Sequence, residues 1–221
     1  MKKYYKLIIF LLLLACVDDS AHGPYGSDNI PPGMVTIDDV INTPGGAIIY
    51  FTPPTDDDLL YVKASFSDEN QIDREVIVSS VIDSLNIVGF AEQGDYPVEV
   101  VAVDRGENES EAVVINISPL EAPIHAILNS MVGSQDFGGI NIAYQNPTRA
   151  EVSLNMSTID EDGNIVFRES FYTSQADSYY SFRGYDPIPT VFIIYVEDKW
   201  GNQTATRSFE ITPLEDIFLD K

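Results

Sequence analysis

The sequence is poor in the side chains that carry most catalytic and metal-binding chemistry. Among its 221 residues are one cysteine, two histidines and one tryptophan, and 12 lysines and arginines stand against 35 aspartates and glutamates. A single cysteine excludes an internal disulfide, because a disulfide joins two thiols. The lack of cysteine and histidine clusters also leaves transition-metal sites without their usual ligands.

The same scarcity limits catalysis. A nucleophile needs an activating base, yet His22 lies in a segment rich in glycine and proline, and we expect His125 in the first strand of a second domain, in a structural or surface role. No Gly-x-Ser-x-Gly motif is present. With 35 acidic residues, carboxylate pairs arise by chance and do not indicate a glycosidase. We therefore predict that the protein is not an enzyme.

The shortage of basic residues makes the chain strongly acidic. Its formal net charge is −23, and removing the three lysines of residues 1–15 from that total gives −26 for the rest. Nucleic acids are bound largely through lysines and arginines that neutralise phosphates, so we predict no nucleic-acid partner. A hydrophobic content of 44% is typical of a globular chain rather than a disordered acidic tail.

What the sequence does contain begins with an export signal. Three lysines among residues 1–6 precede nine apolar residues at 7–15. This run is shorter than the roughly 20 residues of a membrane-spanning helix and is typical of a signal peptide. It ends in Leu13-Leu14-Ala15-Cys16, which resembles the lipobox of bacterial lipoproteins. The resemblance implies cleavage after residue 15 and a lipid on Cys16, through which the protein is anchored to the membrane.

The residues after the cysteine bear on where that membrane lies. Val17-Asp18-Asp19-Ser20 resembles the surface-export signal of Bacteroidota lipoproteins, and a solvated acidic tether is the alternative interpretation. We expect a lipid-anchored protein of the outer membrane, exposed at the cell surface. Residues 16–33 are rich in glycine, proline and polar side chains and are predicted to form a flexible tether.

Beyond the tether, two halves of the chain resemble each other. Gly45-Gly46 corresponds to Gly138-Gly139, residues 103–108 correspond to 196–202, and Ser118-Pro119-Leu120-Glu121 corresponds to Thr212-Pro213-Leu214-Glu215. The offsets are 93, 93 and 94 residues, so the three landmarks recur in order at a constant spacing. Such spacing indicates a tandem repeat. We predict a first domain at 34–120, a second at 121–215 and a C-terminal tail at 216–221.

Each half is a series of short segments of β-branched and aromatic residues, several of which alternate apolar with polar. No stretch has a sustained helical period. About seven strands in roughly 90 residues predict an all-β fold of two tandem immunoglobulin-like or fibronectin-type-III-like β-sandwiches. The expected strands lie at residues 47–51, 59–66, 75–78, 85–88, 98–103 and 110–118 in the first half, and at 152–156, 165–167, 191–196 and 203–212 in the second.

A series of motifs also runs in a fixed order between residues 7 and 215. After the lipobox come Pro32-Gly33, Gly45-Gly46, Asp58–Ala64, Gly89-Phe90, Val103-Asp104-Arg105 and Ser118-Pro119-Leu120. This order resembles the uncharacterised tandem domains at the N-terminus of surface lipoproteins encoded in Bacteroidota polysaccharide-utilisation loci. In that family a discoidin-like, carbohydrate-binding-type domain usually follows, and here the chain stops at Lys221, where it would begin.

The resemblance implies a non-catalytic module of polysaccharide capture, which binds glycan itself or serves as a stalk that presents a binding domain. The alternative is a structural or adhesive module that binds a protein partner, such as an outer-membrane transporter. For glycan binding the candidates are Trp200 with Tyr180 or Tyr185, since sugars stack on exposed aromatic rings. The competing interpretation places Tyr179, Phe182 and Phe171 in the core or between the domains and packs Trp200 on its own turn.

No cofactor is predicted, and calcium is the one metal for which candidate ligand residues can be named. Calcium prefers carboxylate and carbonyl oxygens, which makes Asp56 and Asp58 one candidate pair and Asp160 and Asp162 another. The alternative for the first pair is a solvated loop before a strand. The alternative for the second is a hairpin turn in which Gly163 or Asn164 adopts a positive φ.

Overall fold

The computed structural model describes residues 29–215. The predicted signal peptide, Cys16 and most of the predicted tether lie outside these residues, as does the predicted tail. No helix in the described part is long and apolar enough to cross a membrane.

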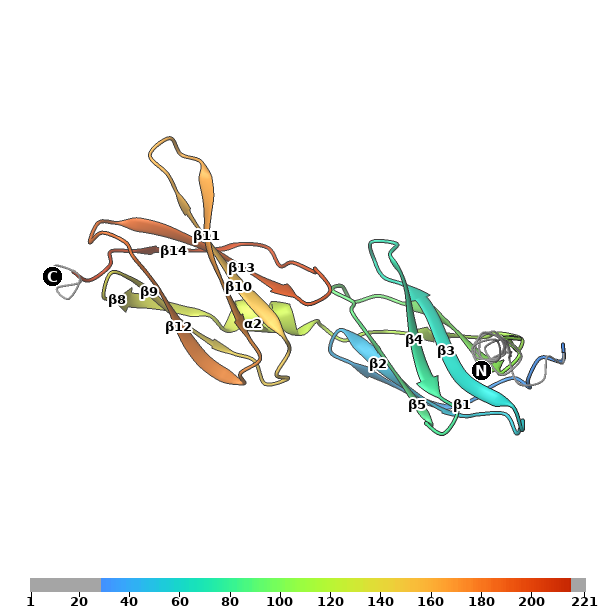
Figure 1. Ribbon diagram of the computed structural model, residues 1–221. Coiled ribbons are helices and arrows are strands. Elements are labelled where there is room, and N and C mark those ends of the chain that lie inside the picture. The colour runs from blue at the N-terminus through green and yellow to red at the C-terminus, as the bar shows by residue number, and fades with distance from the viewer. Residues whose placement is uncertain (1–28, 216–221) are drawn as a thin grey trace, which may run out of the picture.

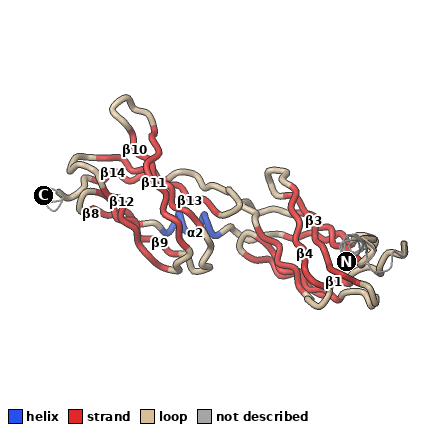
Figure 2. Tube along the Cα trace, viewed as in Figure 1, coloured by secondary structure: helices blue, strands red, loops and turns tan. Residues whose placement is uncertain are grey.

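The described chain forms two β-sandwiches that follow one another in sequence and lie end to end (Figures 1 and 2). The first is built from β1 (Thr36–Thr43), β2 (Gly46–Thr52), β3 (Leu59–Ser67), β4 (Asp73–Ser79), β5 (Ser84–Val88), β6 (Tyr96–Asp104) and β7 (Val113–Ile117). The second opens with the helix α2 (Pro123–Ser130) and continues with β8 (Val132–Asp136), β9 (Gly139–Gln145), β10 (Val152–Ile159), β11 (Ile165–Thr173), β12 (Asp177–Arg183), β13 (Thr190–Asp198) and β14 (Arg207–Ile211).

The two sandwiches share one topology. In the first, the order β1-β2-β5 forms one sheet and β4-β3-β6-β7 the other; in the second, β8-β9-β12 faces β11-β10-β13-β14. Neighbouring strands in each sheet are antiparallel. A three-stranded sheet packed on a four-stranded sheet in this order is the fibronectin-type-III arrangement of the immunoglobulin-like fold. The predicted fold class is therefore confirmed.

Alternation along the strands explains why these segments pair. In β3, Val62, Ala64 and Phe66 point into the first core while Lys63 and Ser65 point outward. Burial of each large apolar side chain contributes about 1.5–3 kcal/mol to folding. The central strands β6 and β10 are buried at six of nine and seven of eight residues, and each has a neighbouring strand on both sides. All ten segments expected to be strands lie in or overlap strands of the structure.

The start of the second sandwich differs from expectation. His125 lies in the helix α2, not in a strand. Pro123 occupies the first helical turn, where its missing N–H costs no hydrogen bond. Ile124, Ile127 and Leu128 form the buried face, a spacing of three and four residues that one helical stripe requires. Eight residues are too few for that period to stand out in the sequence.

The repeated glycine pairs have a steric cause. Gly45 and Gly138 take positive φ angles of 68° and 62° in the β1–β2 and β8–β9 turns, which glycine adopts without strain. The second glycine of each pair lies against a neighbouring strand. A Cβ at Gly46 would overlap the carbonyl oxygen of Ile87, and one at Gly139 would overlap that of Phe182.

We expect Gly46→Ala and Gly139→Ala each to lower the free energy of unfolding by about 2–4 kcal/mol, because the backbone of the neighbouring strand must shift to make room. Urea unfolding followed by circular dichroism measures the loss. Gly163→Ala is the matched control, since Gly163 has a φ of +83° but no atom within 4 Å of its would-be Cβ. It should cost only about 1–2 kcal/mol, the strain of the left-handed backbone alone. Equal losses at all three positions would contradict this explanation.

Candidate functional site

The two sandwiches meet along residues 89–91, the segment that follows β5. Phe90 is buried in the core of the first sandwich, whereas Ala91 packs against the core of the second. The carbonyl oxygen of Ala91 lies 3.2 Å from Nε2 of His125 on α2. One three-residue segment thus contacts both cores, and we call the contact region around it the joint.

The turn after β13 supplies the other side of the joint. Trp200 lies with its indole ring against Gly89, where a Cβ would come within 3.4 Å of Cγ and Cδ1 of the ring. Asn202 donates a hydrogen bond from Nδ2 to the carbonyl oxygen of Gly89 at 3.0 Å. Gly89 has a φ of +110°, so both its conformation and its contact with the indole favour glycine. Trp200 therefore packs on the first sandwich as well as on Lys199 of its own turn.

Asp198 holds this turn in shape. Its Oδ1 accepts hydrogen bonds from the backbone N–H groups of Trp200 and Asn202 at 2.9 and 3.0 Å, and its Oδ2 accepts one from Nδ2 of Asn202 at 2.9 Å. The same arrangement closes the turn after β6, where Asn108 donates to Asp104 through its backbone N–H and its Nδ2, each at 2.9 Å. The Asn108 side chain lowers the pKa of Asp104 by hydrogen bonding to the carboxylate. The repeated Asp–Asn pair thus holds the same turn in both sandwiches, and we call it the Asp–Asn lock. In the second sandwich Asn202 also donates a hydrogen bond to the first sandwich.

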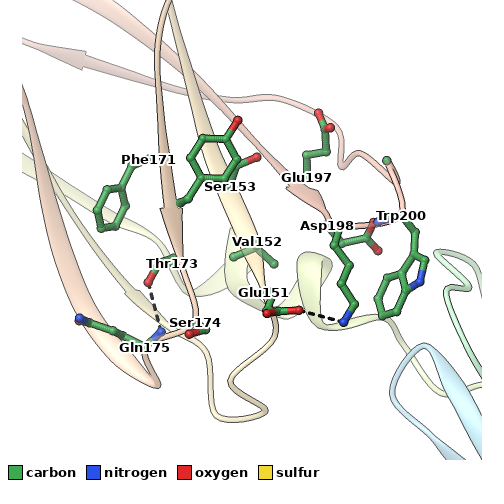
Figure 3. Close-up of a pocket in the computed structure, with 13 residues that line it drawn as sticks. Glu151, Val152, Ser153, Phe171, Thr173, Ser174, Gln175, Glu197, Asp198 and Trp200 are labelled. Carbon is green, nitrogen blue, oxygen red and sulfur yellow. Dashed lines mark hydrogen bonds and ion pairs between the residues drawn. The ribbon is translucent and has the colours of Figure 1, made fainter. Parts of the chain in front are cut away.

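A groove of about 990 Å³ opens beside Trp200 (Figure 3). Its walls come from the start of β10 with Glu151 before it, and from the ends of β11 and β13 with the turns that follow them. Val152 lies between Phe171 on one side and Trp200 on the other. The lining combines aromatic rings with carboxylates, hydroxyls and an amide, contributed by Glu151, Val152, Ser153, Phe171, Tyr172, Thr173, Ser174, Gln175, Glu197, Asp198, Lys199, Trp200 and Gly201.

An exposed ion pair crosses the groove next to the indole. Nζ of Lys199 lies 2.8 Å from Oε2 of Glu151 and 4.9 Å from the centroid of the Trp200 ring. The hydrogen bond and the charge of Lys199 lower the pKa of Glu151. Exposed pairs of this kind add little to stability. The pair and the cation–π contact instead orient Trp200, whose ring is in contact with both Lys199 and Gly89.

The structure does not bring Trp200 together with Tyr180 or Tyr185. Tyr180 lies between the sheets, stacked on Phe171 with ring centroids 3.9 Å apart, and donates its hydroxyl to Glu169. Tyr185 packs edge-on against Phe192, near the start of β13, while Trp200 follows the end of that strand. The six residue steps from Phe192 to Asp198 span about 20 Å of strand. Tyr180 and Tyr185 therefore pack in and around the core, apart from Trp200.

The other aromatic residues considered from the sequence divide differently from expectation. Phe182 is fully buried in the core of the second sandwich, as the core interpretation predicts. Tyr179 is 70% exposed, so its expected core or inter-domain position is wrong. The reason is parity: adjacent residues of β12 point to opposite faces, so that Tyr180 and Phe182 cover the core and Tyr179 does not.

The calcium candidates lie in turns. Asp56 and Asp58 precede β3, and their carbonyl oxygens accept hydrogen bonds from the N–H groups of Leu59 and Arg105. Oδ1 of Asp160 accepts from the N–H groups of Asp162 and Asn164 at 3.0 and 2.8 Å. Gly163, with its positive φ, completes the β10–β11 hairpin turn. Across residues 29–215 no three histidine, cysteine, aspartate or glutamate side chains gather as a metal site.

Tyr172 and Tyr195 were not among the site residues predicted from the sequence. Tyr172 is 78% exposed and lines the groove. Tyr195 is half-buried on β13 between the inward-pointing Ile194 and Val196. The alternation of side chains along β11 and β13 could have predicted their positions. Once the inward-pointing residues are known, it places both tyrosines on the outer face of their sheet.

Comparison with known proteins identifies two domain families. Residues 32–119 match the model of a domain of unknown function (DUF4959), and residues 120–221 match that of another domain of unknown function (DUF5126). No curated protein matches the chain.

Several solved structures are similar in part. SusE-like protein BT2857 is 26% identical over 40% of this chain and 30% of its own length, with a TM-score of 0.36. A two-domain fibronectin type-III segment of chicken tenascin is 13% identical over 83% of this chain and 99% of its own, with a TM-score of 0.35. The chicken interferon gamma receptor alpha chain is 11% identical over 85% and 100%, with a TM-score of 0.33. The present chain thus matches less than a third of the length of the SusE-like protein.

The bond from Asn202 to Gly89 can be tested against another turn of the same sandwich. Nδ2 of Asn164 donates to Oδ2 of Asp160 in the exposed β10–β11 turn, as Nδ2 of Asn202 donates to Oδ2 of Asp198. We expect Asn202→Ala to lower the free energy of unfolding by roughly 1–3 kcal/mol more than Asn164→Ala, because Asn202→Ala also leaves the carbonyl oxygen of Gly89 without its donor. Urea unfolding of the two variants side by side gives the difference, and equal losses would mean that the bond to Gly89 contributes nothing.

Proposed function

We propose that this chain is a non-catalytic, lipid-anchored cell-surface module of polysaccharide capture, and that it acts as a stiff two-domain spacer. The lipid on Cys16 holds one end at the outer membrane, and the two sandwiches separate that end from the other. The blue start and the red end of the described chain lie at opposite ends of the molecule (Figure 1), as a spacer requires. The polysaccharide setting is supported by the motif order that resembles surface lipoproteins of utilisation loci.

The observation that carries this proposal is the joint. Tandem domains joined by free linkers move relative to each other, whereas here contacts cross between the two sandwiches. Leu120, at the end of the first sandwich, is fixed to the β1–β2 turn: its N–H donates to the carbonyl oxygen of Thr43, and its own carbonyl oxygen accepts the N–H of Gly45, each at 3.0 Å. Trp200 and Asn202 of the second sandwich contact Gly89 of the first, and Ala91 packs against the second core. Bending at the connection would break the contacts of Trp200, Asn202 and Ala91 together.

The charge of the chain fits the same role. A formal charge of −23 keeps such a surface soluble and repels it from anionic headgroups. Repulsion from the membrane favours an extended position of the two domains at the end of the tether. A spacer needs no catalytic group, and none of the sequence features considered supplies one.

Stiffness can be measured as a distance distribution. With Cys16→Ser as background, spin labels at Val81→Cys in the first sandwich and Tyr179→Cys in the second report the inter-domain distance by double electron–electron resonance. Both positions are highly exposed, at 86% and 70%, so labels should not disturb the fold. We expect one narrow peak, which Trp200→Ala combined with Asn202→Ala broadens.

Asn108→Ala, which alters the equivalent turn away from the joint, should leave the peak narrow. A broad distribution in the unmodified joint would refute the spacer proposal.

A further inference from the structure

On the outer face of the sheet β11-β10-β13 in the second sandwich, a row of short polar side chains on β10 lies between aromatic side chains of β11 and β13. We call this arrangement the trough. Its floor consists of the outward side chains of β10, Ser153, Asn155 and Ser157, which are short and only 6%, 5% and 7% exposed. Tyr172 and Phe167 rise on β11 opposite Ser153 and Ser157, and Tyr195 rises on β13 opposite Asn155. A short polar floor thus lies between taller aromatic side chains on both neighbouring strands.

The side chains of the trough are ordered by their own contacts. Nδ2 of Asn155 donates to Oγ of Ser153 at 2.9 Å, and Oγ of Ser170 donates to Oδ1 of Asn155 at 2.5 Å. Burial, then the charge of Glu197 and the neighbouring Tyr172 raise the pKa of Tyr195. Tyr172 is paired with Ser153 and Tyr195 with Asn155, so the two phenols lie on the same face of the sheet on opposite sides of β10. The walls remain open to solvent, since Tyr172 is 78% and Phe167 is 56% exposed.

The first sandwich provides an internal comparison. Its β3 pairs with β4 and β6 as β10 pairs with β11 and β13, so Lys63 takes the place of Asn155 and Glu75 that of Phe167. Lys63 forms ion pairs with Glu109 at 2.5 Å and with Glu75 at 4.0 Å. That face is a charged surface with a long side chain at its centre. The fold therefore does not require the aromatic walls that the second sandwich carries.

The chemistry of the trough selects among ligands. Of the six residues paired with its floor, Glu197 alone is charged, although the chain as a whole is strongly acidic. An anionic ligand would be repelled by the surrounding surface, and a cationic one would find better partners elsewhere on it. Aromatic faces attract polarised C–H groups, and the rings of Tyr172 and Phe167 are open to solvent here. A neutral sugar presents such C–H groups and needs no charged partner, so the exposed rings favour it.

We propose that this face binds a neutral, extended polysaccharide across β10, with Tyr172 and Tyr195 as ring platforms above the buried polar side chains of β10. The trough continues into the groove beside Trp200, because Ser153 and Tyr172 belong to both. A polymer can therefore pass along the face without an end being captured. The inference gives the second sandwich a ligand of its own and does not depend on a stiff joint, so either proposal can fail alone.

The test compares two exposed surfaces of the same sandwich. The purified chain is run in affinity gels that contain neutral polysaccharides, such as xylan, mannan, β-glucan and starch, or the acidic polymers pectate and alginate. We expect at least one neutral polymer to retard the chain and the acidic ones not to. Tyr172→Ala combined with Tyr195→Ala should weaken binding at least roughly tenfold, since each ring contributes on the order of 1 kcal/mol to a stacking contact.

Tyr179→Ala is the matched control, because Tyr179 is 70% exposed on the opposite sheet. It should leave binding within about twofold, and circular dichroism should show all variants folded. Retention should also persist in about 0.5 M salt, because a neutral ligand is held without ion pairs. No retardation by any neutral polymer, equal loss in Tyr179→Ala, or binding confined to acidic polymers would overturn the proposal. So would a protein partner that covers Tyr172 and Tyr195 while sugars leave them unaffected.

Discussion

The hydrogen bond from Asn202 to the carbonyl oxygen of Gly89, covered by the indole of Trp200, is the constraint on which the arrangement of the two sandwiches depends. Each sandwich has its own core and would be complete without it. The bond alone contributes about 1 kcal/mol. Its effect is larger because it acts with Ala91, which packs against the core of the second sandwich, and with the indole of Trp200, which lies against Gly89. A rotation at the connection would have to break these contacts together.

The repeat explains what the two sandwiches share, and the departures from it indicate where function lies. Both copies keep the glycine pair, the Asp–Asn lock and the Ser/Thr-Pro-Leu-Glu segment, each of which has a backbone reason to recur. The second copy alone places a tryptophan in its lock and aromatic walls on its outer sheet. Where the first copy has the ion-paired Lys63, the second has Asn155. The copies therefore use one fold for different surfaces.

Much of the fold could be predicted from the sequence, because alternation and turn residues are local signals. Ten of the fourteen strands in the described part of the chain and the tandem order follow from them, whereas β1, β8, β9 and β12 were not predicted. The helix α2 was missed because eight residues cannot display a helical period. The candidate site was harder to predict. The partners Asn202 and Gly89 are 113 residues apart, and nothing local at either position names the other. Tyr180 was mistaken for a surface ring because its side of β12 depends on which neighbours are buried.

Residual dipolar couplings of the backbone amides, measured in a weakly aligned sample, test the central claim of a fixed joint most directly. Each sandwich reports its own alignment, and the orientation of one relative to the other follows without labels or substitutions. If the joint is fixed, the couplings of both sandwiches fit a single alignment tensor with the inter-domain geometry described above. Two tensors of different magnitude would mean that the sandwiches move independently, and would contradict the account.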